Sequence, residues 1–129
     1  MPLTLLLKPH ERLFINGAVI VNGEAKSSLS VLNDVPVLRE KDILTEKTAD
    51  TPCKQIYLTV QLMYMDDKEL PTYHKIFGEL VRDVIQAAPS TTATIQQISE
   101  LVLAEEYYPA LKVAKRLIDI EREIMSHAK

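Results

Sequence analysis

The side chains that most often perform catalysis or bind metals are few and scattered in this chain. The three histidines, His10, His74 and His127, have no second histidine, cysteine or carboxylate at the spacing of a metal site. The single cysteine, Cys53, excludes an internal disulfide and a multi-cysteine zinc site. The adjacent Lys54 and a helix N-terminus could lower the pKa of the Cys53 thiol, but no matched base stands beside it in the sequence.

Two further patterns point away from catalysis. The three glycines, at positions 17, 23 and 78, are too far apart to build a glycine-rich phosphate loop. The pair Asp66–Asp67 is typical of a solvated helix end. The sequence therefore predicts a protein that is not an enzyme and needs no metal or other cofactor.

The distribution of charge limits where a nucleic acid could bind. The 129 residues carry a net charge of −3, whereas proteins held on nucleic acid by charge alone are usually basic. Residues 1–55 contain seven basic and seven acidic residues, and residues 56–129 carry the whole acidic excess. A surface for a polyanion is therefore expected in the N-terminal part, where it must depend on local geometry.

Composition indicates a globular protein of the cytoplasm. Hydrophobic residues make up 47% of the chain and charged residues 26%, which is typical of a folded domain. No apolar run approaches the roughly 20 residues needed to cross a bilayer. Residues 1–8 lack the basic start and the cleavage site of a signal peptide, so we expect a cytoplasmic protein without a membrane partner.

The strongest candidate for a binding element is the segment Leu38–Asp42, where four charged residues follow a leucine. An arginine on an edge strand, such as Arg39, can contact base edges and phosphates together with main-chain donors. Single-stranded RNA leaves such base edges unpaired. The alternative is a solvent-facing strand whose charges compensate one another.

The first third of the chain is expected to form antiparallel strands. Apolar runs bounded by turn residues predict strands over residues 3–8, 13–15, 18–21, 25–31 and 37–44. Asn16–Gly17 and Asn22–Gly23 both suit type I′ turns, since both central positions of that turn need positive φ. Two such turns would connect the strands in a tight meander.

The remainder of the chain is expected to be helical. Residues 45–51 are polar, lack apolar anchors and predict a linker. Thr51 and Pro52 suit the cap and first position of a helix. Residues 56–65 alternate like a strand, but this start signal and their Leu, Met and Gln content favour a helix.

Three further helices complete the predicted architecture. They are expected over residues 73–85, 94–106 and 109–125, with Thr94 and Gln97 as a capping box for the second of these. The sequence thus predicts an α+β protein. A β-rich module over residues 1–50, an antiparallel hairpin meander or small barrel, precedes a helical module over residues 51–129.

Tyr107 and Tyr108 form an aromatic pair just before the last predicted helix. The pair suits contact with a partner protein. It equally suits one ring in the core and one at the rim of a corner between helices, and both alternatives remain open at this point.

An ordered set of motifs resembles the FlbT family of flagellar regulators from alphaproteobacteria. The matching segments run in order over nearly the whole chain: Met1–Leu3 with Leu5 and Leu7, Leu13–Val19, Val37–Ile43, Thr51–Pro52 with Ile56–Tyr57, Met63–Asp66, and Tyr107–Tyr108 with Ala110–Leu111. The resemblance implies an RNA-binding, post-transcriptional regulator of flagellin. It implies action on the 5′ untranslated leader of flagellin mRNA, as a repressor or an activator of its translation or stability, together with a second flagellar protein, FlaF.

A second resemblance, confined to the first third, is to the carbon-storage regulator CsrA, a β-rich dimer that binds GGA-type motifs in mRNA leaders. It rests on Leu5, on Glu11 before Leu13–Ile15, and on Val37–Glu40. It implies that Leu5 lies in the first strand and Arg39 in an RNA-contacting strand, and it leaves a homodimer open.

Two departures from CsrA weaken the phosphate-binding part of this resemblance. The chain has Leu7–Lys8 where CsrA has a basic pair, and His10 where CsrA has a glycine. The RNA motif therefore stays open.

The resulting hypothesis is steric and allosteric regulation rather than chemistry. The N-terminal strands are expected to bind a single-stranded stretch near the ribosome-binding site, with contacts from Leu5, Lys8, Arg12, Arg39 and Lys41. The helical module is expected to recruit FlaF, another copy of the chain or decay machinery. On this hypothesis Arg39→Ala weakens RNA binding by well over about tenfold and leaves the fold intact.

The alternative belongs to a different class of protein. An acidic helical half with apolar stripes suits an adaptor or chaperone-like factor that binds flagellin or FlaF in flagellum assembly, and RNA effects are then indirect.

Overall fold

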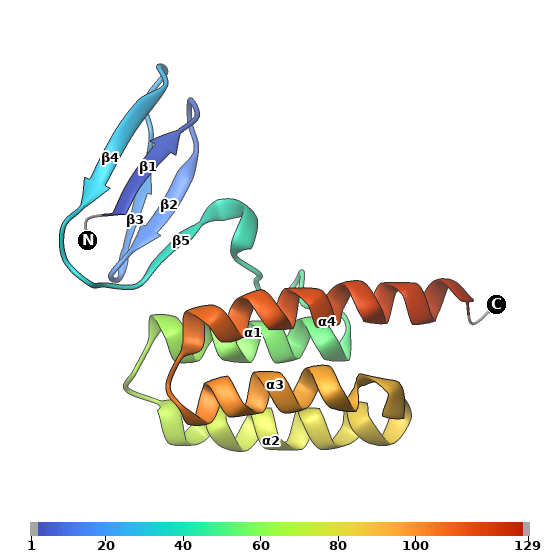
Figure 1. The fold of residues 1–129 in the computed structure, drawn as a ribbon. Coiled ribbons are helices and arrows are strands. Elements are labelled where there is room, and N and C mark those ends of the chain that lie inside the picture. Colours follow the sequence, from blue (N-terminus) through green and yellow to red (C-terminus); the bar gives the residue numbers. More distant parts are fainter. Residues whose placement is uncertain (1–2, 128–129) are drawn as a thin grey trace. The chain divides into compact units, whose positions relative to one another are not determined.

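The structure is a computed structural model, and it describes residues 3–127. The chain divides between Ile43 and Leu44 into two compact units, a β unit and a helical unit (Figure 1). The expected α+β class is therefore confirmed, with the strands first and the helices after them.

The β unit contains two small antiparallel sheets. One pairs β1 (Leu3–Leu7) with β4 (Ser27–Val31), and the other has the order β3-β2-β5, formed by β3 (Ala18–Val21), β2 (Arg12–Ile15) and β5 (Val37–Arg39). Both sheets contribute to one apolar cluster. Its buried members are Leu5, Leu7, Leu13 and Val37, and the partly buried Ile15, Leu29, Val31 and Val35 pack against them.

The first Asn–Gly pair forms the predicted hairpin turn between β2 and β3. Asn16 has φ 46° and Gly17 has φ 93°, the two positive values that a type I′ turn requires. Ile15 and Ala18 face each other directly across the turn.

The second Asn–Gly pair does not form a hairpin, so the predicted meander is wrong. β4 pairs with β1 rather than with its neighbour β3. The Asn22 side chain instead donates from Nδ2 to the carbonyl oxygens of Lys8 at 2.7 Å and Ala25 at 3.1 Å, and it accepts from Ser27 Oγ at 2.7 Å. These hydrogen bonds hold the crossover that carries the chain from one sheet to the other.

The last predicted strand is shorter than expected. β5 ends at Arg39, and Glu40–Asp42 form a single 3₁₀ turn, η1, in which the Ile43 N–H donates to the Glu40 carbonyl at 3.2 Å. The charged run therefore leaves the sheet after three residues, and Lys41 lies outside the strand.

The helical unit begins at the predicted signal. α1 (Pro52–Met65) is capped by Thr51, whose hydroxyl accepts from the Lys54 N–H at 3.2 Å, and Pro52 occupies the first turn. The fully buried residues Ile56, Val60 and Met63 recur at spacings of four and three, which is the period of a helix. Residues 56–65 are thus helical, as predicted.

Three more helices follow α1 and pack into one bundle (Figure 1). They are α2 (Leu70–Ala87), α3 (Thr92–Leu103), which follows a 3₁₀ turn, η2 (Pro89–Thr91), and α4 (Tyr107–His127). α4 packs against both α1 and α3, while α1 also packs against α2. On α4 the buried residues are Ala110, Leu111, Val113, Ala114 and Leu117.

Two local details of the helical unit differ from expectation. α3 starts at Thr92 rather than at the predicted capping box, because the Thr91 and Thr92 hydroxyls donate back to the carbonyls of Ala88 and Pro89, each at 2.7 Å. The segment 45–51 is not without an apolar anchor, because Ala49 is only 4% exposed.

Within residues 3–127, each helix is too short or too polar to span a bilayer.

The glycine of the type I′ turn yields the first prediction. Gly17→Ala should destabilise the β unit by about 1–2 kcal/mol, because φ is +93° there although no atom would meet the added Cβ within 4 Å. Gly78→Ala, in the interior of α2 and equally free of steric contact, should stabilise the helical unit by about 1 kcal/mol.

Denaturant-dependent amide hydrogen exchange, read separately for the two units, measures both effects. An unchanged β unit in Gly17→Ala would contradict the assigned turn.

Candidate functional site

Arg39 points into the β unit rather than out of it. Its partner in the register between β2 and β5 is Leu13, a core residue, so both side chains lie on the inner face of the sheet. The guanidinium Nη1 donates to the Leu6 carbonyl oxygen at 3.0 Å and to Glu11 Oε2 at 3.2 Å. Arg39 therefore ties β5 to β1 and to the loop before β2.

Glu11 is the carboxylate at the centre of this cluster. Its Oε1 accepts the Lys8 backbone N–H at 2.9 Å, while Oε2 receives Arg39. The hydrogen bond from the Lys8 N–H is the main cause that lowers the pKa of Glu11 below its ordinary value of 4.5; burial opposes it, and Arg39 adds to it. The carboxylate is thus held in its charged form by the fold.

His10 occupies the tight turn that presents Glu11. Its φ is +63°, a conformation that favours glycine over a residue with a Cβ. The CsrA resemblance implies a glycine at this position. Here a histidine adopts the positive φ that a glycine adopts more easily.

The predicted RNA-contacting residues are not gathered in one place. Leu5 lies on β1, as expected, but it is only 7% exposed and belongs to the core, so its side chain is not a contact for a ligand. Lys8, Arg12 and Lys41 are exposed. Arg12 alternates with Leu13 along β2 and so lies on the opposite face of the sheet from Arg39.

The tyrosine pair divides between two environments. Tyr107 is half-buried, and its hydroxyl lies 3.3 Å from His74 Nε2. Tyr108 is 43% exposed; its ring centroid lies 5.6 Å from that of Tyr64, and Lys112 Nζ lies 5.1 Å above the Tyr108 ring. Tyr108 therefore offers an accessible aromatic surface, whereas the half-buried Tyr107 contacts His74 of α2.

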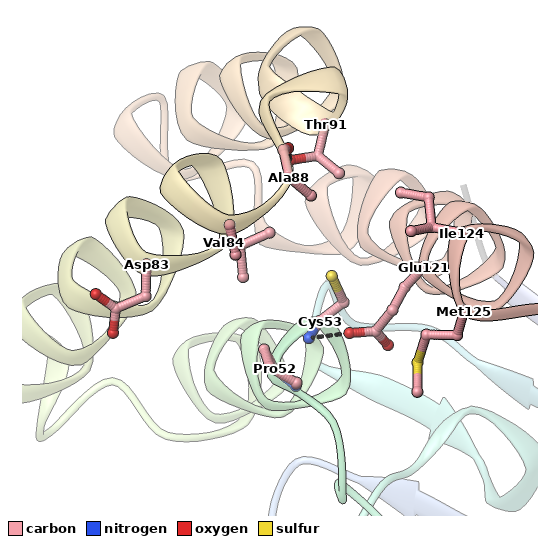
Figure 2. A pocket seen from close by; sticks show the side chains of 10 residues that line it. Pro52, Cys53, Asp83, Val84, Ala88, Thr91, Glu121, Ile124 and Met125 are labelled. Atoms are coloured by element: carbon pink, nitrogen blue, oxygen red, sulfur yellow. Dashed lines mark hydrogen bonds between the residues drawn. The ribbon is translucent and has the colours of Figure 1, made fainter. Parts of the chain in front are cut away.

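The helical unit contains a groove of about 400 Å³ that sequence reasoning did not anticipate. It lies between the N-terminus of α1, the C-terminal end of α2 with η2, and the C-terminal part of α4 (Figure 2). Ile124 and Met125, at 38% and 59% exposure, continue the apolar stripe of α4 past its buried part and form one wall. The other lining residues are Pro52, Cys53, Asp83, Val84, Ala87, Ala88, Thr91 and Glu121.

Cys53 and Glu121 meet beside this groove (Figure 2). Glu121 accepts the Cys53 backbone N–H at 3.1 Å and the Thr51 hydroxyl, so it caps α1 from a distant helix. Burial, followed by the charge of Glu121, raises the pKa of the Cys53 thiol to about 12. The expected lowering is wrong because burial of the thiol and the charge of Glu121 both disfavour the thiolate, while Lys54 pairs with Asp50 at 3.2 Å.

The residues that the structure describes contain no cluster of three histidine, cysteine or acidic side chains that could hold a metal ion.

Comparison with known proteins identifies the family. The sequence model described as "Flagellar protein FlbT" matches residues 3–125. The chain belongs to the FlbT family. No solved structure matches it.

Several named relatives of the FlbT family cover nearly the whole chain. The chain is 41% identical over 126 residues to the probable flagellum biosynthesis repressor protein FlbT of Rhodopseudomonas palustris, covering 98% of this chain and 99% of that protein. It is 42% identical over 125 residues to the probable flagellum biosynthesis repressor protein FlbT 1 of Bradyrhizobium diazoefficiens, covering 96% and 85%. It is 36% identical over 129 residues to the flagellum biosynthesis repressor protein FlbT of Caulobacter vibrioides, covering 98% and 92%.

The Glu11 cluster predicts a specific dependence of stability on pH. Because the pKa of Glu11 is lowered on folding, its charge stabilises the β unit above pH 4.5, and this contribution is lost as the pH falls through the lowered pKa. Glu11→Gln should therefore be less stable than the natural chain at neutral pH, and the difference should shrink on acidification below 4.5.

Urea unfolding followed at β-unit amides over a pH series measures this difference. Glu24→Gln, which removes an exposed carboxylate of the same unit, is the control for the loss of one charge. A difference that stays constant over the whole series would contradict the role given to Glu11.

Proposed function

We propose that this protein represses flagellum biosynthesis, as its named relatives do, by binding the single-stranded 5′ leader of flagellin mRNA through the β unit. The relatives are named flagellum biosynthesis repressors, which supports the regulatory role. Binding near the ribosome-binding site would block translation or expose the message to decay. No step of this mechanism requires a catalytic residue.

The observation that carries the proposal is that the β unit exposes cationic side chains that are not engaged in ion pairs with other described residues. Lys8, Arg12 and Lys41 are exposed and form no ion pair within residues 3–127. Residues 3–43 contain five basic and five acidic residues, whereas residues 44–129 carry the whole net charge of −3. The neutral β unit therefore repels phosphates less than the acidic helical unit does. Within the β unit, the negative charge of Glu11 is already compensated by Arg39.

Arg39 supports binding through the fold rather than as a free side chain. Both of its hydrogen bonds inside the unit use Nη1, and its side chain is only 28% exposed. Removing it takes away the donor to Glu11 Oε2 and to the Leu6 carbonyl and leaves Glu11 with only its hydrogen bond from the Lys8 N–H. Arg39→Ala is therefore expected to lower stability as well as affinity. The exposed cations give a cleaner test.

The single variants Lys8→Ala, Arg12→Ala and Lys41→Ala should each weaken RNA binding and reduce its salt dependence, by about one unit of slope per lost phosphate contact. Their side chains are exposed, so the fold should persist. A gel-shift titration of labelled leader RNA over a salt series measures the effect, with an unrelated RNA for specificity. Lys75→Ala, an exposed lysine of α2 with the same change in charge, is the matched control. Equal slopes for all four variants and the natural chain would refute the role given to these three cations.

The second candidate function is an adaptor that binds flagellin or FlaF, and the groove of the helical unit favours it. Ile124 and Met125 expose apolar surface there, a feature typical of protein-binding sites. The exposed ring of Tyr108, on the same helix, is a further candidate contact.

Met125→Glu should abolish co-elution with FlaF or flagellin if the adaptor function holds, because a charge enters an apolar groove. Leu103→Glu, on a still more exposed leucine of α3 outside the groove, is the control. Specific, salt-sensitive RNA binding without co-elution supports RNA recognition, and co-elution without RNA binding supports the adaptor.

A further inference from the structure

The outer edge of β3 is unlike the other sheet edges of the β unit. Natural sheets protect their edges with short strands, charges or polar side chains, because exposed N–H and C=O groups recruit further strands. β5 has only three residues and runs into a charged turn, and β4 carries three serines. On β1, the Leu6 carbonyl already accepts from Arg39.

β3 is only one residue longer than β5, but it has no charged or polar side chain to protect its edge. Its sequence is Ala-Val-Ile-Val, all four residues are exposed, and β2 is its only partner among the described strands. Val19, Ile20 and Val21 are 69%, 37% and 55% exposed. β-branched residues favour strand pairing, so this edge is suited to accept another strand.

The hairpin geometry fixes which backbone groups face outward. In a two-residue hairpin the residues flanking the turn, here Ile15 and Ala18, exchange hydrogen bonds. The Asn22 N–H donates to the Glu11 carbonyl at 2.9 Å, so residues 18, 20 and 22 direct their amides toward β2. The amides and carbonyls of Val19 and Val21 therefore point away from the sheet.

We propose that β3 pairs antiparallel with β3 of a second copy of this chain, in a register centred on Ile20. Val19 of one copy then lies opposite Val21 of the other, and each of these pairs exchanges both N–H···O=C bonds. Ile20 packs against Ile20 on the opposite face, as a pair without hydrogen bonds. Two three-stranded sheets become one continuous sheet around a two-fold axis.

Self-complementarity is the reason to choose a second copy as the occupant. β3 carries no charge, so antiparallel self-pairing sets no like charges opposite each other. The same register satisfies the outward backbone groups and stacks β-branched side chains on both faces. Three short side chains cover less than the roughly 800 Å² per partner of a standard interface, so the dimer is weak and forms by mass action.

The mass of the full chain, measured by sedimentation over about a hundredfold range of concentration, tests the interface. The natural chain should shift from monomer to dimer as concentration rises. The double variant Val19→Lys with Val21→Lys should stay monomeric, because each hydrogen-bonded pair then opposes two lysines. Leu103→Lys, on an exposed leucine of α3, should dimerise like the natural chain.

A complementary variant tests the register itself. In Val19→Glu with Val21→Lys, each pair sets opposite charges against each other, so dimerisation should return to at least the natural level. Circular dichroism confirms that each variant is folded.

Amide exchange at Val19 and Val21, but not at Ala18 and Ile20, should slow as the concentration of the natural chain rises. A natural chain that stays monomeric, which would leave this edge to a different protein or to none, overturns the proposal. So does a dimer that survives in the double lysine variant. None of these measurements involves RNA, so their outcome is independent of the proposed function.

Discussion

The inward-facing guanidinium of Arg39 links the two sheets of the β unit. Arg39 belongs to β5, yet it donates to the Leu6 carbonyl on β1 and to the Glu11 carboxylate. A partly buried carboxylate is stabilised by a charged partner that also donates a hydrogen bond to it. The register that sets Arg39 opposite Leu13 thus decides how the sheets are joined and which cations stay available.

This arrangement changes how the unit can meet a polyanion. The Arg39 guanidinium is engaged within the β unit, where it orders the loop that carries Glu11 and neutralises the charge of Glu11. The side chains of Lys8, Arg12 and Lys41 stay exposed. The acidic helical unit carries the net charge of the chain. The charge distribution therefore makes the neutral β unit, rather than the acidic helical unit, the better candidate for contact with a polyanion.

The helical unit uses a charged residue in a comparable way. Glu121 of α4 caps the N-terminus of α1. Burial, and after it the charge of Glu121, raises the pKa of the Cys53 thiol, so the cysteine at this helix N-terminus is not activated as a thiolate. Carboxylates near a helix N-terminus stabilise it. The same contact fixes the α4 segment whose Ile124 and Met125 line the groove. Cys53 and Glu121, which could suggest catalysis, serve here to hold α4 beside α1 and so to position the wall of the groove.

The sequence alone determined the features that depend on adjacent residues: the Asn16–Gly17 turn, the start of α1 at Thr51–Pro52, and the order of strands and helices. Only the tertiary structure decided the role of Asn22 and the inward direction of Arg39. The partners of these side chains lie 14, 28 and 33 positions away in the chain. Backbone preference is set by neighbouring atoms, whereas a side chain takes whichever donor or acceptor the fold brings within reach, and that is fixed only when the strands have paired.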